Sequence, residues 1–157
     1  MSLPSSLAKN YRDLHFGGNW TVTNLKEVLS EINFETAQTK IEGFNTIAAL
    51  TFHIHYFTKV TLEVLEGKPL NAHDKYSYDV PNFNNEQEWR GFLNQYWTEA
   101  KRFADLVEAL DDNQLFEVFS EEKYGNYYRN ISGIIEHGHY HLGQIVILNK
   151  MIIQKKI

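Results

Sequence analysis

Apolar side chains recur at helical spacing along most of this 157-residue chain, and the alternation typical of strands is rare. The clearest helix is predicted over Thr46–Glu66, with Asn45 as its N-cap and with Gly67 and Pro69 as its stop signal. A helix with one apolar face has to bury that face against another element. The pattern therefore predicts an all-α fold in which several helices share one core.

Further helical segments flank this helix on both sides. They are predicted at about Ser5–His15, at Thr21–Ile32, at Glu35–Ile41, from a cap at Asn84 with Gln87 in the capping-box position to about Leu110, and at Tyr128–Ile153. Four substantial helices with short or medium connections predict a four-helix bundle with short extra helical segments. The connection 67–85 is too long for a simple hairpin, so it is expected to cross the bundle or to cover one end of it. No linker interrupts the pattern, which predicts a single domain over residues 1–157.

Composition excludes several classes of protein. The net charge of −5 and the lack of a basic stripe argue against a nucleic-acid partner. The absence of cysteine excludes disulfides, iron–sulfur clusters, zinc–thiolate sites and a cysteine nucleophile. No apolar run approaches the roughly 20 residues that span a bilayer, and the N-terminus lacks the apolar core of a signal peptide. We therefore expect a cytoplasmic protein with no membrane partner.

Three of the seven histidines lie on apolar faces of predicted helices. His137 and His141 are four residues apart on the last helix, a spacing that places both imidazoles on one face about one turn apart. His53 falls within the apolar face of the helix Thr46–Glu66. A buried imidazole without a partner is costly, so these three histidines are expected to converge on a divalent metal ion.

The other histidines lack this placement. His55 and His139 each lie two residues from a candidate ligand, about 200° around the helix, and are expected to be surface residues or outer neighbours of the site. His15 and His73 lie near predicted helix ends or loops and carry no spacing signal.

The same pattern has a second interpretation. A buried histidine can be a hydrogen-bonded core residue, and a pair spaced by four can arise by chance, so spacing alone leaves both interpretations open. A metal held by three histidines keeps one coordination position open, which is the pattern of catalytic sites. If the protein is an enzyme, we expect a pocket beside the histidines lined by aromatic residues from 76–83 and 124–128. If the histidines are only hydrogen-bonded core residues, we expect a solid core around them and no pocket.

Two well-known metal motifs do not fit. The zincin motif requires glutamate directly after the first histidine, and here Gly138 follows His137. A ferritin-like di-iron site needs two Glu-x-x-His motifs, and only Glu136 with His139 matches. No glycine-rich phosphate loop and no G-x-S-x-G motif is present.

Two stretches resemble the DinB/YfiT-like superfamily. The run TIAALTFH, which ends at His53, resembles that family's second-helix histidine motif, and HGHYHLGQI from His137 onward closely resembles its last-helix motif, a histidine pair followed by Gly-Gln. The resemblance implies a four-helix bundle in up-down-down-up order, with 67–85 as the long connection between the second and third helices. It also implies that His53, His137 and His141 are the metal ligands.

The family contains metal-dependent hydrolases and thiol-dependent S-transferases, so the resemblance implies a small-molecule substrate, with a low-molecular-weight thiol as one candidate. Neutral imidazole suits zinc, nickel, iron or copper, and among these we expect zinc or nickel. Gln144 is expected at the edge of the site, and Arg129 is expected either to meet an anionic substrate group or to form a surface salt bridge. Glu136 and Tyr140 are expected to face away from the histidine pair, which leaves no general base and favours thiol activation over hydrolysis.

A non-catalytic metal- or ligand-binding bundle of stress-response type is the alternative. A homodimer through exposed helix faces is a further expectation.

Overall fold

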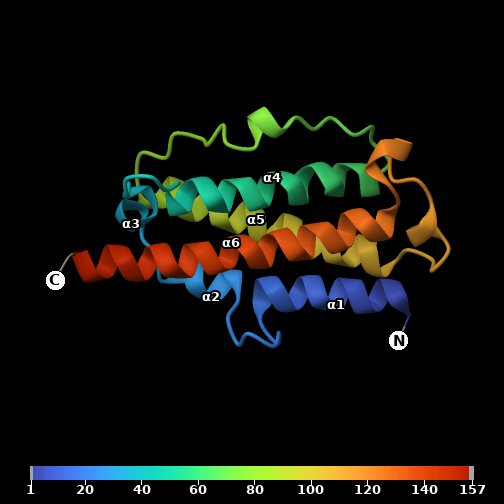
Figure 1. The fold of residues 1–157 in the computed structure, drawn as a ribbon, viewed down its shortest axis with the longest axis horizontal. Helices are drawn as coiled ribbons and strands as arrows, with labels where there is room; N and C mark the ends of the chain where they lie inside the picture. The colour runs from blue at the N-terminus through green and yellow to red at the C-terminus, as the bar shows by residue number, and fades with distance from the viewer. Residues whose placement is uncertain (1, 156–157) are drawn as a thin grey trace.

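The computed structural model describes residues 2–155, and these residues are all-helical apart from loops and one isolated bridge between Val118 and Asn126. The elements are α1 (Leu3–Phe16), α2 (Leu25–Ser30), α3 (Phe34–Gln38), α4 (Ile47–Leu65), η1 (Asp74–Tyr76), α5 (Glu86–Glu108), η2 (Gln114–Phe116), η3 (Glu122–Tyr124) and α6 (Tyr127–Lys155) (Figure 1). Within this described part of the chain, no helix combines the length and the apolar character needed to cross a lipid bilayer.

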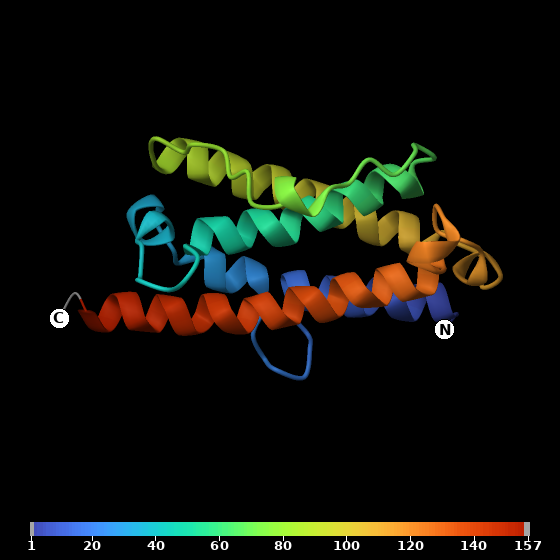
Figure 2. The same ribbon diagram turned by 45° about the horizontal axis from the view of Figure 1, so that its top comes forward.

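The long helices α1, α4, α5 and α6 lie alongside one another (Figure 1). Helices α1 and α6 run in one direction and α4 and α5 in the other, and each of α1 and α4 packs against both α5 and α6. The connection 66–85 returns along the length of α4 before α5 begins, as both views show (Figure 2). The all-α prediction and the expectation that this connection crosses the fold are confirmed.

The core between the long helices is rich in aromatic side chains. Its four largest fully buried members are Trp89, Tyr11, Tyr96 and Phe103, which are joined by leucines and isoleucines such as Leu14 and Ile54. The apolar faces expected from the sequence are the faces that pack against one another, because helical spacing places every third or fourth side chain on the same side.

The N-terminal third differs most from expectation. The first segment extends over all of α1, whereas the helix predicted at Thr21–Ile32 is reduced to the six residues of α2. The reason is the cap at Asn24, whose side chain accepts a hydrogen bond from the backbone N–H of Glu27, so the helix starts there. Residues 17–24 form a projecting loop instead, with Val22 at φ 55°.

Two predicted caps are wrong by one residue. Thr46, not Asn45, caps α4 by accepting a hydrogen bond from the N–H of Ala49 at 3.1 Å. Asn85, not Asn84, caps α5, and Glu88 takes the capping position that was predicted for Gln87. In both places two adjacent residues have side chains that can cap, and the sequence does not choose between them.

Close packing between α1 and α6 sets the orientation of α6. Gly138 is buried against α1, and a Cβ atom added there would lie only 2.5 Å from Cδ2 of Leu14. The missing side chain therefore lets the two helices approach closely with Gly138 turned toward α1. His137 and His141 then lie on the side of α6 that packs against α4.

Candidate metal centre

Three histidine side chains from two helices meet at one point between α4 and α6. The Nε2 atom of His137 lies 3.0 Å from Nε2 of His53 and 3.0 Å from Nε2 of His141. One ring nitrogen of each residue lies within 4.8 Å of the others, and within residues 2–155 no carboxylate or further histidine completes a larger group. The three residues predicted as ligands are brought together.

The far nitrogen of His53 is held by a serine from the connection 66–85. The hydroxyl of Ser77 donates its proton to the carbonyl oxygen of Asp74 at 2.7 Å, so its oxygen is left to accept from Nδ1–H of His53 at 2.9 Å. His53 is therefore the Nδ1-protonated tautomer, and its Nε2 presents a lone pair to the other two histidines.

Gln144 holds His141 in the same way. Its amide oxygen accepts a hydrogen bond from Nδ1–H of His141 at 2.6 Å, which leaves Nε2 of His141 unprotonated. Gln144 lies one helical turn beyond His141, so the contact follows from their spacing on α6. The sequence placed Gln144 at the edge of the site, and the structure shows the atom that it contacts.

These hydrogen bonds test whether the residues fit a metal. With Nε2 of both His53 and His141 unprotonated, a proton on His137 Nε2 would satisfy only one of the two 3.0 Å contacts and leave the lone pair of the other histidine without a donor. A cation would accept all three lone pairs. The 3.0 Å separations also lie close to the roughly 3.3 Å expected between nitrogen ligands of a tetrahedral zinc ion. The three histidines therefore fit a divalent metal.

Burial keeps the three imidazoles neutral. It lowers the pKa of His53, His137 and His141, and the neighbouring imidazoles lower the first two further, which brings the pKa of His137 to about 4. A neutral imidazole with a free lone pair is the form that binds a metal ion.

Aromatic rings surround the three histidines. Tyr78 stacks on His53 with ring centroids 4.1 Å apart, and Phe57 contacts the rings of both His53 and His137 edge-on. Tyr140 was expected to face away, but its ring lies 4.8 Å from that of His141 although 65% of the residue is exposed. That expectation is wrong because a tyrosine ring can reach sideways across the helix surface to its neighbour.

A cavity of about 450 Å³ opens beside His137. Phe57 and Ile134 give it apolar walls, and Tyr124 and Arg129 stand at the N-terminal end of α6. The expectation of an aromatic-lined pocket is met in part, by Tyr124 from the segment 124–128. Tyr78, from 76–83, stacks on His53 and is not part of this cavity's lining.

Arg129 forms no ion pair with any residue of the described chain. The surface salt bridge considered for it is therefore absent over residues 2–155. Its guanidinium lies along α6 over Gly133, where an added Cβ would be 3.0 Å from Nη1.

Two histidines outside the cluster are buried. This contradicts the expectation for His55, and no expectation was made for the burial of His15. His55 was expected at the surface or beside the site, yet it is only 4% exposed and donates a hydrogen bond to the carboxylate of Glu99 on α5. His15 is fully buried and bonds to the carbonyl oxygen of Tyr11 and the hydroxyl of Tyr96. Only their partners on other helices explain these positions, and sequence spacing does not report them.

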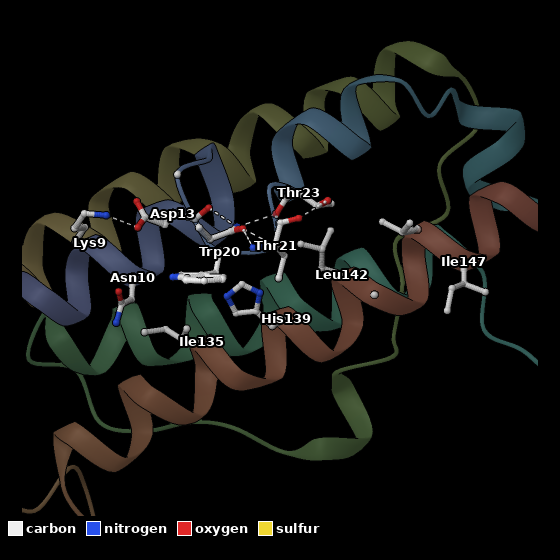
Figure 3. Close-up of a pocket in the computed structure, with 14 residues that line it drawn as sticks. Lys9, Asn10, Asp13, Trp20, Thr21, Thr23, Ile135, His139, Leu142 and Ile147 are labelled. Carbon is white, nitrogen blue, oxygen red and sulfur yellow. Dashed lines mark hydrogen bonds and ion pairs between the residues drawn. The ribbon is translucent and has the colours of Figure 1, made fainter.

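His139 faces away from the cluster, as predicted. It lines a separate cavity of about 870 Å³ between α1, the loop 17–24 and α6, together with Ile135 and the exposed Trp20 (Figure 3). His73 is exposed in the connection 66–85.

Ser77 is the site residue that the sequence does not reveal, whereas Tyr78 falls in the aromatic range 76–83 that was expected beside the histidines. Both come from the connection 66–85, more than 20 positions from His53, and neither belongs to a motif. For Ser77 the one signal in the sequence is the expectation that this segment covers the bundle.

The chain matches no protein-family model, and comparison with curated proteins and with solved structures finds no significant similarity. The functional argument therefore rests on the geometry of the site.

Proposed function

We propose that the chain is a metal-dependent enzyme that binds zinc or nickel through His53, His137 and His141 and acts on a small molecule. We also propose that its fold is an up-down-down-up four-helix bundle of the DinB/YfiT-like superfamily. The helix directions and the long connection 66–85 support the second proposal. The HGHYHLGQI run on α6 supports both.

One observation carries the enzyme proposal: three imidazole lone pairs converge beside an open cavity without a fourth protein ligand among residues 2–155. A metal that only stabilises a fold is normally enclosed by four protein ligands, whereas a catalytic site keeps one position for water or substrate. His137 belongs both to the cluster and to the wall of the cavity.

The chain's own residues organise this site. Ser77 and Gln144 each hold one histidine as the tautomer that presents Nε2, which removes the need to reorder the rings when an ion binds. Phe57 and Tyr78 pack against the rings and limit their rotation. A divalent ion bound there would act as a Lewis acid that lowers the pKa of a bound water or thiol.

Among the two reactions implied by the resemblance, thiol transfer has the better support. No carboxylate lines the cavity, and the only histidine in its wall is the candidate ligand His137. Hydrolysis benefits from a base that takes a proton from water, whereas a thiol is acidic enough to ionise on a metal without one. We therefore favour a low-molecular-weight thiol as one substrate.

The test is metal content by elemental mass spectrometry on untagged protein purified without a nickel column. We expect about one zinc or nickel ion per chain, lost in His53→Ala and in His137→Ala/His141→Ala while circular dichroism still shows a helical fold. His139→Ala is the matched control, because this histidine lies on the same helix and lines the other cavity. Wild-type protein that is purified without metal and does not bind added zinc or nickel would contradict the metal site.

The metal-loaded protein then enters a screen for thiol transfer and for hydrolysis. Thiol consumption that disappears in His137→Ala would support the S-transferase. Hydrolysis without any thiol requirement would contradict that preference, and a metal-loaded protein without either activity would favour a non-catalytic binding bundle.

A further inference from the structure

The cavity beside His137 is cationic in a protein of net negative charge. Lys123 and Arg129 line it and no aspartate or glutamate does, although the chain has 20 acidic residues and 15 basic ones. The ammonium of Lys123 lies 3.0 Å from the carboxylate of Glu121, which offsets its charge. Arg129 is therefore the cation without an acidic partner in this cavity.

Arg129 differs in this respect from every other arginine of the chain. Arg12 pairs with Asp105 at 2.8 Å, Arg90 with Glu86 at 2.6 Å, and Arg102 with Glu66 at 3.6 Å. A guanidinium offers a planar set of donors that matches carboxylate and phosphate oxygens. Arg129 leaves these donors free for a ligand.

The position of Arg129 is defined by the helix that also carries two of the candidate ligands. Arg129, Gly133 and His137 follow one another at intervals of four residues, so they share one face of α6. Asn126 fixes the first turn by accepting a hydrogen bond from the N–H of Arg129 at 2.9 Å. Since Gly133 has no side chain, the guanidinium can lie over it, one turn and about 6 Å along the helix axis from His137.

We propose that this cavity binds a small molecule with a carboxylate or phosphate group, and that Arg129 pairs with that group. The volume of about 450 Å³ suits a small ligand. The apolar walls at Phe57 and Ile134 suit a short apolar middle, and the far end of the ligand points toward the three histidines. The role of that far end rests on the proposed function, whereas the anion site rests on Arg129 and the cavity alone.

The first experiment uses metal-free protein and inorganic phosphate, with the arginine Nε–H signals followed by NMR. We expect the Arg129 signal of the wild type to shift with saturation, and Arg129→Gln to weaken phosphate binding at least about tenfold, because a charge-assisted bidentate pair is lost. Arg102→Gln is the matched control, since it removes an equally charged, exposed arginine outside the cavity. Absence of saturable binding, or equal binding by Arg129→Gln, would overturn the anion site.

The second experiment places the anion relative to the histidines. Cobalt(II)-loaded protein is titrated with 3-mercaptopropionate and with its neutral methyl ester, and the sulfur-to-cobalt charge-transfer band reports binding. We expect the wild type to prefer the acid by about tenfold and Arg129→Gln to lose that preference. Equal binding of acid and ester by the wild type would overturn the proposed orientation.

The two proposals fail separately. Phosphate binding at Arg129 in a protein that takes up no metal would leave the anion site standing and remove the metalloenzyme. Metal binding with no effect of Arg129→Gln in either experiment would do the reverse.

Discussion

Two groups of histidines in the helical bundle are shielded from solvent to similar degrees and behave differently. In the first group, His53, His137 and His141 point ring nitrogens at one another. In the second group, which we term the core pair, His15 and His55 point theirs at Tyr96 and at Glu99. His53 and His55 are only two residues apart on α4 and are 8% and 4% exposed, so burial does not distinguish the groups.

The difference lies in the partner of each nitrogen. His15 donates from Nδ1 to the carbonyl oxygen of Tyr11 and accepts at Nε2 from the hydroxyl of Tyr96, so both nitrogens are satisfied within the protein. His53 is satisfied at Nδ1 by Ser77, and its Nε2 faces only other imidazoles. A buried imidazole with hydrogen-bond partners at both nitrogens stabilises the fold. Imidazoles whose lone pairs converge can instead bind a cation. The core pair should therefore control stability and the cluster should control metal binding.

The largest expected effect is on metal affinity. His137→Ala removes the nitrogen that lies 3.0 Å from both other ligands, and we expect zinc affinity to fall by more than about a hundredfold, beyond the loss typical of outer hydrogen-bonding partners. Competition with a chromogenic zinc chelator measures it. His139→Ala should keep the wild-type affinity, and equal affinities in wild type and His137→Ala would break the assignment of the cluster.

The next effect is on stability and belongs to the core pair. His15→Leu removes the acceptor of the buried Tyr96 hydroxyl, so the free energy of unfolding should fall by about 1–3 kcal/mol. Urea denaturation of metal-free protein measures it. His53→Leu should cost clearly less in the same assay, because it removes one of the facing lone pairs. Equal losses would erase the distinction between the groups, as would reduced zinc affinity in folded His15→Leu.

A smaller effect is expected from the connection 66–85. Ser77→Ala removes the acceptor that orients His53, and such partners typically contribute about 10- to 100-fold to metal affinity. The chelator competition measures this change as well. Ser30→Ala is the control, because its exposed hydroxyl bonds only to the carbonyl oxygen of Glu27. An unchanged affinity in Ser77→Ala would mean that Phe57 and Tyr78 suffice to orient the ring.

The smallest expected effect is the contribution of His15 to the pH dependence of stability. Burial lowers the pKa of His15 from 6.5 to about 3, so below pH 6.5 the unfolded chain binds a proton that the folded protein does not, and stability falls as the pH drops toward 3. Between pH 7 and pH 5.5, His15 alone should account for about 1 kcal/mol of lost unfolding free energy. Urea denaturation of metal-free wild type and His15→Leu at both pH values isolates this share, because the lowered pKa values of the cluster act equally in both proteins. Parallel losses in the two proteins would contradict the role of His15.

Much of this arrangement could be predicted from the sequence, for a physical reason. Helical periodicity places His53, His137 and His141 on apolar faces, and faces of that kind must meet in a core. The same logic fails for His55, whose offset from His53 indicates another side of α4 but does not say that α5 covers that side and supplies Glu99. Side-chain partners from distant segments, such as Ser77, follow no period and therefore leave no pattern to read. The family assignment from the two histidine motifs stays a prediction.

Gly138 shows how far the cause of the site lies from the site itself. The close approach of Leu14 makes α1 the template against which α6 is rotationally set, although α1 contributes no ligand. A chain deprived of its first helix would keep all three ligands and the HGHYHLGQI run, and α6 would still pack against α4, but the contact with Leu14 that fixes the rotation of α6 would be lost. A sequence comparison that scores the histidine motifs alone would count such a chain as having the site. A search for other chains with this site therefore has to include the N-terminal helix as well.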